Sequence, residues 1–162
     1  MSGAVDFGAL LPHLEAAFAE VAARALGLDS VEVERRLEEP PAPYQGAYLG
    51  LLAARGAIQV GVASDEAGCQ ALSRGLLSLP EAEPPLCAAE LADALCEIAN
   101  IVAGGFKSRV RETTGSLAMG LPVFFHGPAQ PTDHTAVRVA VLRAGAVRVA
   151  LLLMHPRAGK EG

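Results

Sequence analysis

The stretch 93-DALCEIANIVAGGFK-107 has the period of an α-helix and sorts its side chains onto two opposite sides. At about 100° per residue, one narrow stripe collects polar residues and a glycine: Glu90, Asp93, Glu97, Asn100, Gly104 and Lys107. The opposite side collects bulky apolar residues: Leu91, Leu95, Ile98, Val102 and Phe106. A helix that is apolar on most of its circumference should be buried on most of its circumference. We therefore predict a long helix over 86–107 that leaves one polar stripe exposed.

Two further helices are predicted before this one. Residues 6–26 place apolar side chains at three- and four-residue spacings and end at Gly27, a residue suited to close a helix. Ser64 and Asp65 can cap a second helix that runs to about Leu77. Proline residues separate it from the long helix.

The rest of the chain favours strands. Residues 31–39, VEVERRLEE, are typical of a short strand near an edge, and residues 44–54 and 57–63 of a hairpin. After the long helix we expect strands over 121–126, 135–142 and 147–154, the last two again paired as a hairpin. This order predicts an α+β fold in which a six-stranded, largely antiparallel sheet packs with three helices.

Composition limits the classes of function. A chain of 162 residues, 51% hydrophobic and 19% charged, suits one domain over 1–162, and the absence of a long uninterrupted apolar run argues against a membrane span. The first residues favour an amphipathic helix over a signal peptide. A net charge of −5 argues against nucleic acid as a partner. The densest basic group, Lys107, Arg109 and Arg111, is expected to follow the helix end, where cations complement the last carbonyls, and the alternative is a docking patch.

The cysteine and histidine residues give no sign of a metal or a disulfide. Three cysteines are an odd number and form no CxxC pair, and the four histidines lack a ligand spacing. We therefore expect no metal site, and a reduced, cytoplasmic location.

The polar stripe itself has two interpretations. The simplest is that an amphipathic helix needs a polar face. However, Asn100 stands in mid-helix, where its propensity is poor, and Gly104 and Gly105 each cost up to about 1 kcal/mol relative to alanine. These penalties favour a functional need for an amide group and for close backbone approach.

The same residues carry a resemblance to a known family. Asp93-x-x-x-Glu97-x-x-Asn100 resembles the D/S-x-x-x-E-x-x-N signature of the CheC/CheX phosphatases, and the continuation to Gly104 and Lys107 is similar to that family's N-x-x-x-G-x-x-K. The segment 119-MGLPVFFHG-127 is similar to the proline-containing strand that follows the signature helix. One motif is present, as in CheX-like members, and the first helix offers no second one. Phe106 is bulkier than the residue expected at its position.

The resemblance implies a phosphatase that acts on the aspartyl phosphate of a CheY-like receiver domain. It implies catalytic roles for Glu97, which would pair with a receiver lysine, and for Asn100, which would position the attacking water. Asp93, Gly104 and Lys107 are then expected to contact the partner. The protein would need no cofactor of its own, because the receiver supplies Mg²⁺.

The sequence is also compatible with two other functions. The same fold could serve a non-catalytic adaptor that binds a receiver or a flagellar-switch component, or the chain could be an unrelated ligand-binding α+β domain. The resemblance also implies a homodimer, which we expect to form through the sheet edge because the strand over 147–154 is too apolar for an open edge. Alternatively, that strand lies at the centre of the sheet, buried on both faces.

Overall fold

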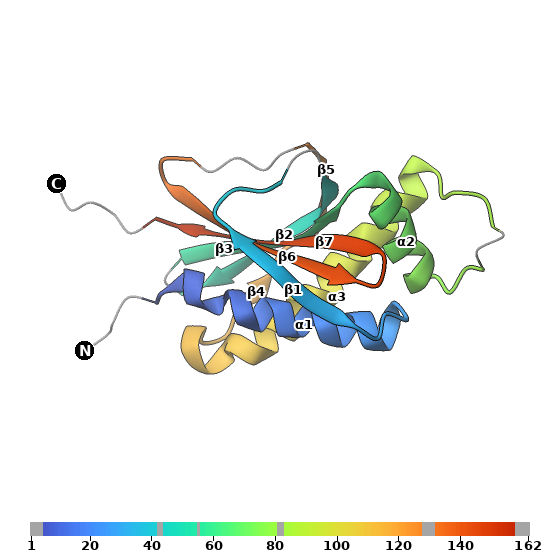
Figure 1. Ribbon diagram of the computed structural model, residues 1–162. Coiled ribbons are helices and arrows are strands. Elements are labelled where there is room, and N and C mark those ends of the chain that lie inside the picture. Colours follow the sequence, from blue (N-terminus) through green and yellow to red (C-terminus); the bar gives the residue numbers. More distant parts are fainter. Residues whose placement is uncertain (1–4, 42–43, 55, 81–82, 128–131, 158–162) are drawn as a thin grey trace.

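The computed structural model describes residues 5–41, 44–54, 56–80, 83–127 and 132–157. Three α-helices and a seven-stranded sheet make up this part of the chain, which confirms the predicted α+β class (Figure 1). The helices, with a 3₁₀ turn before the first, are η1 Phe7–Leu10, α1 Leu11–Ala25, α2 Glu66–Leu76 and α3 Ala88–Thr114. The strands are β1 Val31–Leu37, β2 Gln45–Ala53, β3 Gly56–Ser64, β4 Ala118–Met119, β5 Val123–His126, β6 Thr135–Ala144 and β7 Val147–Pro156.

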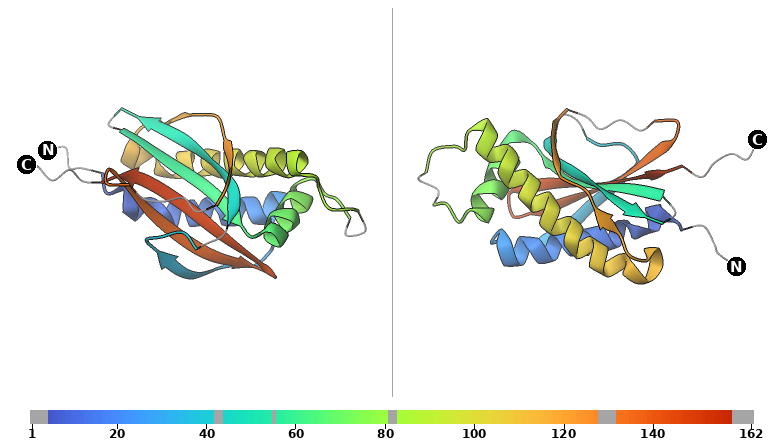
Figure 2. Two further views of the ribbon diagram at one scale, coloured as in Figure 1. Left: turned by 90° about the horizontal axis from the view of Figure 1, so that it is seen from above. Right: turned by 180° about the vertical axis from the view of Figure 1, so that it is seen from behind.

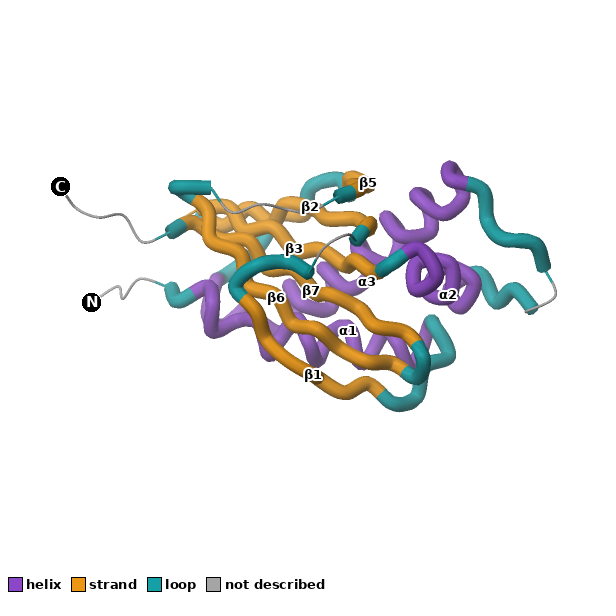
Figure 3. Tube along the Cα trace, turned by 45° about the horizontal axis from the view of Figure 1, so that its top comes forward, coloured by secondary structure: helices purple, strands orange, loops and turns teal. Residues whose placement is uncertain are grey.

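The helices and the sheet form two layers. Helices α1 and α3 lie side by side across one face of the sheet, and α2 packs at one end against α3 (Figures 2 and 3). The main apolar core fills the space between the layers, with Phe18 of α1 and Phe106 of α3 fully buried. This arrangement buries α3 on several sides and leaves one side of it at the surface.

The strand order is β1-β6-β7-β3-β2-β4, with β5 also paired to β2, and every pairing is antiparallel. The expected number of strands was six, and the difference lies in one segment. The strand expected over 121–126 is β5, which begins at Val123, and the additional strand is β4, which precedes it and is separated from it by Gly120-Leu121-Pro122. Pro122 has no N–H for the ladder, and Gly120 instead donates its N–H to the carbonyl of Gly50 at 2.8 Å.

The expectation that the strand over 147–154 supplies the sheet edge is wrong. Strand β7 lies between β6 and β3 and is paired along both sides, so the alternative of a central strand is confirmed. The apolar run needs no second copy to cover its backbone. One edge is instead β1, as its charged sequence predicted, and a bulge between Val33 and Arg35 interrupts its pairing with β6.

Helix α1 begins as its sequence requires. Pro12 stands in its first turn, where a missing N–H costs nothing. Beyond the other end, Gly27 adopts a positive φ of 67°, and Leu28 donates its N–H back to the carbonyl of Ala22. Helix α2 begins as expected at Asp65, whose side chain accepts from the N–H of Gly68 at 2.7 Å.

Helix α3 begins two residues later than predicted and ends seven residues later, at Thr114. Its start is fixed by Gln70 of α2, whose amide both donates to the carbonyl of Leu86 and accepts from its N–H. The helix continues past Lys107 because Val110 extends the apolar spacing into the core, where it is buried. It ends at Gly115, which has a φ of 75°. Arg109 and Arg111 therefore lie within the helix and do not follow it.

Candidate functional site

The polar stripe of α3 lies at the surface. Asp93 and Glu97 are exposed, and Asn100, Gly104 and Lys107 are partly exposed. The five residues assigned to the opposite side of the helix are all buried: Leu91, Leu95, Ile98, Val102 and Phe106. The periodicity of the sequence therefore located both sides of this helix correctly.

Phe106 does not interfere with the stripe. Its side chain is fully buried and packs in the core between the helices and the sheet. On the helix it points away from Asn100, which is six residues earlier and about 120° away around the axis. Its bulk is therefore a feature of the core, and it leaves the surface of the candidate site unchanged.

Four side chains of the stripe have no polar partner in the part of the protein that the structure describes. Among the described residues, no hydrogen bond or ion pair involves the side chains of Asp93, Glu97, Asn100 or Lys107, whereas Glu90 accepts from the N–H of Cys87 and belongs to the helix cap. One helical turn separates Glu97 from Asn100, about 4.5 Å along the axis. A carboxylate and a carboxamide on adjacent turns are thus free to enter a partner's cleft together.

Gly104 and Gly105 differ in their surroundings. A Cβ at Gly104 would meet no atom within 4 Å, so the fold does not require glycine there. A Cβ at Gly105 would lie 3.5 Å from the Cβ of Ala17, at the contact between α3 and α1. Gly104 therefore leaves a gap in the exposed stripe, one turn after Asn100.

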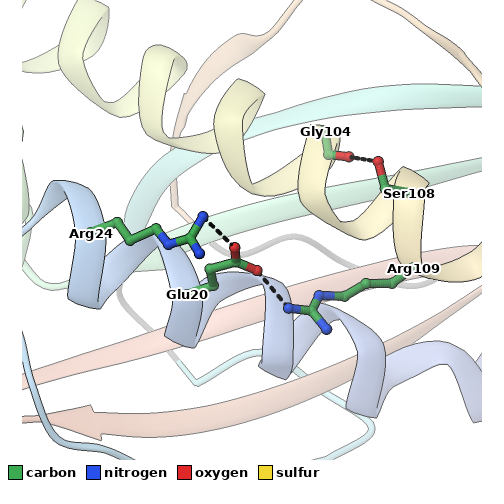
Figure 4. A network of polar contacts seen from close by, with 5 residues as sticks. All are labelled: Glu20, Arg24, Gly104, Ser108 and Arg109. Atoms are coloured by element: carbon green, nitrogen blue, oxygen red, sulfur yellow. Dashed lines mark hydrogen bonds and ion pairs between the residues drawn. The ribbon is translucent and has the colours of Figure 1, made fainter.

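The second half of α3 forms polar contacts within the helix and with α1 (Figure 4). Ser108 donates its hydroxyl to the carbonyl of Gly104 at 3.2 Å. Glu20 of α1 accepts from Arg109 of α3 at 2.6 Å and from Arg24 of its own helix at 2.8 Å. Arg109 is thus committed to the contact between the helices, away from the stripe.

The thiol of Cys96 borders the stripe. It is half-buried, and burial, together with the negative charge of Asp93, raises its pKa. A thiol that is harder to ionise is a poor nucleophile.

The site is a helix surface, and it is separate from two cavities found at the surface of the described residues. A cavity of about 390 Å³ is lined by residues of the N-terminal segment, β1 and β6, and one of about 320 Å³ by residues near the end of α3. Neither is lined by a residue of the stripe. Within the described ranges, no cluster of three or more His, Cys, Asp or Glu side chains could hold a metal ion, and no helix is long and apolar enough to cross a membrane.

Helix α3 lies within a region that matches the model of a known protein family. A family model described as Chemotaxis phosphatase CheX matches residues 48–142, more than half of the chain, including all of α3. The chain belongs to the CheX family. No curated protein sequence matches it.

Solved structures share the CheX fold at low sequence identity. A CheX protein from Vibrio vulnificus has a TM-score of 0.73 and 16% identity, and the match covers 91% of this chain and 99% of that one. The complex named CheX-CheY-BeF3-Mg²⁺ from Borrelia burgdorferi has a TM-score of 0.72 and 13% identity, over 96% and 100% of the two chains. The FliM middle domain from H. pylori follows at 0.63 and 10% identity, over 93% and 89%. The CheX fold is therefore shared with proteins that carry other names.

Sequence analysis missed two residues of the stripe because it ended the helix at 107. Arg111 is exposed and lies within about 20° of Asp93 around the helix axis, and Ser108 lies one turn beyond Gly104. The sequence could have identified Arg111, because a step of four residues from Lys107 reaches it on the same face of a helix.

Proposed function

We propose that this chain is a phosphatase that hydrolyses the aspartyl phosphate of a CheY-like receiver domain. The observation that carries the proposal is the pair Glu97 and Asn100. Both side chains lie on the exposed stripe of α3 without a hydrogen bond or ion pair among the described residues, in a chain of the CheX family. A receiver substrate also implies a cytoplasmic location.

Hydrolysis of an aspartyl phosphate requires few groups from the phosphatase. An aspartyl phosphate is a reactive acyl phosphate, and its hydrolysis needs a water molecule held in line with the P–O bond that breaks. The carboxamide of Asn100 can donate to one water and accept from it without removing its proton, which suits this positioning role. In the proposal, Mg²⁺ and the groups that neutralise the phosphoryl oxygens belong to the receiver, and this chain supplies no cofactor.

The other residues of the stripe would bind the partner. Glu97 would pair with a lysine of the receiver's active site, so that Asn100 enters the same cleft one turn away. Asp93, one turn earlier, would contact the receiver or support Glu97. Gly104 would admit the partner's backbone close to the helix, and Lys107 would contact the partner beyond it.

A binding module without catalytic activity is the second candidate. The observation in its favour is that a FliM domain shares the fold, so the fold alone does not separate a phosphatase from other proteins. Asn100 distinguishes the two functions. An adaptor needs the exposed stripe for affinity, but it has no need for a water-positioning amide at one position.

The decisive experiment measures phosphate release. A purified receiver is phosphorylated with acetyl phosphate and Mg²⁺, and release is followed with the wild type, Asn100→Ala and the control Glu112→Ala, an exposed change on the same helix. We expect the wild type and the control to accelerate release and Asn100→Ala to lose the acceleration while it remains folded. Binding of the receiver by the wild type without acceleration would favour the adaptor.

We also propose a homodimer, which the family resemblance implied. With β7 at the centre of the sheet, an edge-to-edge dimer would have to use β1 or the edge formed by β4 and β5. The latter is short but apolar, with Leu52, Leu121 and Val123 exposed near it. Light scattering tests the dimer, because a mass near 16.7 kDa at micromolar concentration would exclude it.

A further inference from the structure

Charges of one sign gather at each end of the α3 stripe. Asp93 and Glu97 are four residues apart on one face of the helix, and so are Lys107 and Arg111. Like charges at this spacing repel each other, whereas alternating charges would have stabilised the helix. Asn100 and Gly104 lie between the two pairs. The centres of the acidic and the basic pair are fourteen residues apart, which is about 21 Å along the axis.

The helix macrodipole does not explain this distribution. Its influence falls off within the first and last turns. Asp93 and Glu97 lie beyond the first turn, which begins at Ala88, and Lys107 lies before the last turn, which ends at Thr114. Only Arg111 is placed where the dipole favours a cation.

Most other arginines have a polar partner among the described residues, unlike Arg111. Within the described part of the chain, eight of ten arginines form an ion pair or a side-chain hydrogen bond, and the exceptions are Arg35 and Arg111. Arg109, two residues before Arg111, is among the eight, through its pair with Glu20. Arg111 is exposed, and no described carboxylate neutralises it or Lys107.

We propose that Lys107 and Arg111 form a second docking contact that binds acidic side chains on the surface of the receiver, about 21 Å from the basic group that faces Asp93 and Glu97. This inference rests on the proposed function and deepens it, because it states the charge pattern of the partner. A helix with an acidic end and a basic end binds a partner of complementary pattern in one direction only. The basic end would thereby set the direction in which the receiver lies along α3 and deliver its phosphoryl group to Asn100.

The same pattern is self-complementary, so two copies of α3 could also pair in antiparallel fashion. The receiver is the better occupant, because such a pairing would cover Glu97 and Asn100 and close the exposed gap at Gly104. The two occupants give opposite results in light scattering. A dimer held by α3 would dissociate on Arg111→Glu or at high salt in the absence of a receiver.

The test compares Arg111→Gln and the double variant Lys107→Gln/Arg111→Gln with two controls, each of which removes one positive charge elsewhere. Arg35→Gln changes the exposed edge strand β1, and Arg109→Gln changes the same helix away from the stripe. Affinity for a purified CheY-like receiver loaded with BeF₃⁻ and Mg²⁺ is measured at about 50 and 500 mM salt, alongside KM and kcat for its phosphorylated form.

We expect the double variant to weaken binding and raise KM by about three- to tenfold at low salt, with kcat retained and the difference largely gone at high salt. The controls should differ from the wild type by less than twofold. An equal loss in Arg35→Gln, a loss confined to kcat, or an α3-mediated dimer would overturn the docking contact. Binding without phosphate release would overturn the proposed function alone. A wild type that binds none of the receivers of its own cell would overturn both.

Discussion

The buried carboxylate of Glu15 on α1 accepts two hydrogen bonds from the guanidinium group of Arg36 on β1. Arg36 donates from Nε at 3.0 Å and from Nη2 at 2.7 Å, one to each carboxylate oxygen. Only 8% of the Glu15 side chain is exposed, against 56% for Arg36. The hydrogen bond to Glu15 raises the pKa of the Arg36 guanidinium above its usual range. This pair fastens an edge strand of the sheet to the first helix.

We expect Arg36→Ala to lower the free energy of unfolding by about 1–3 kcal/mol, because the buried Glu15 carboxylate would lose its partner. Arg138→Ala is the matched control, since Arg138 pairs with Glu38, whose carboxylate is largely exposed, and such surface pairs contribute less than about 1 kcal/mol. Urea unfolding measures both. Equal losses in the two variants would show that the burial of Glu15 does not matter.

Glycine at position 104 makes the helix less stable than it could be. Gly104→Ala should raise the free energy of unfolding by about 0.5–1 kcal/mol, since the added Cβ meets no atom and alanine is the better helix former. The same variant should weaken binding of the receiver, because the methyl group fills the gap in the stripe.

Gly105→Ala provides the comparison for this prediction. Its Cβ would make an ordinary contact with Ala17 inside the protein, so it should also raise stability, yet leave the affinity for the receiver unchanged. Thermal unfolding and calorimetric titration separate the two effects. If Gly104→Ala binds as tightly as Gly105→Ala, the partner does not approach the helix backbone at this turn.

Sequence reasoning located elements well where they have one buried face. The spacing of apolar residues in α1 and α3 and the hairpin of β2 and β3 could be read directly, since each must present its apolar side chains to the same core. It was wrong about β7, because an apolar run fits a central strand and a paired edge equally well. Only the neighbours of a strand, which the sequence does not contain, distinguish these cases.

For the candidate site, too, the sequence predicted only part of what the structure shows. Periodicity found the exposed stripe, but the helix was expected to end at 107, with the basic residues following its end. Helix α3 continues because Val110 is buried in the core, a tertiary contact that outweighs the local signals. The chemical roles of Glu97 and Asn100 came from the family resemblance, since an exposed Glu and Asn one turn apart would also suit a solvated surface.

Glu97 should determine affinity more than catalysis. If it pairs with a lysine in the receiver's cleft, Glu97→Gln should weaken binding of the BeF₃⁻-loaded receiver by some 2–5 kcal/mol, because the partner's buried charge is left unpaired. Glu90→Gln, on the same helix but in the cap, should change affinity little. Isothermal titration calorimetry measures both, and unchanged affinity in Glu97→Gln would place this residue outside the interface.

The three thiols should react in the order of their exposure. Cys87 is exposed, Cys96 is half-buried with a raised pKa, and Cys69 is buried, where desolvation raises its pKa to about 12. At pH 8, a thiol reagent should therefore modify Cys87 first, Cys96 slowly and Cys69 only after unfolding. Binding of the receiver should slow the reaction of Cys96, which borders Glu97, and leave that of Cys87 unchanged.

Burial of Cys69 should also make stability depend on alkaline pH. Its thiol packs at the start of α2 and donates to the carbonyl of Gln45 at 3.3 Å, and burial disfavours the thiolate. Because the pKa in the folded state, about 12, lies above the ordinary value of 9.0, the thiol's contribution is complete below pH 9 and is lost as the pH rises towards 12. Urea unfolding at pH 8, 9 and 10 should show a decline in the free energy of unfolding that is smaller in Cys69→Ala. The control Cys87→Ala should retain the decline of the wild type, and an identical decline in all three proteins would assign it to other groups.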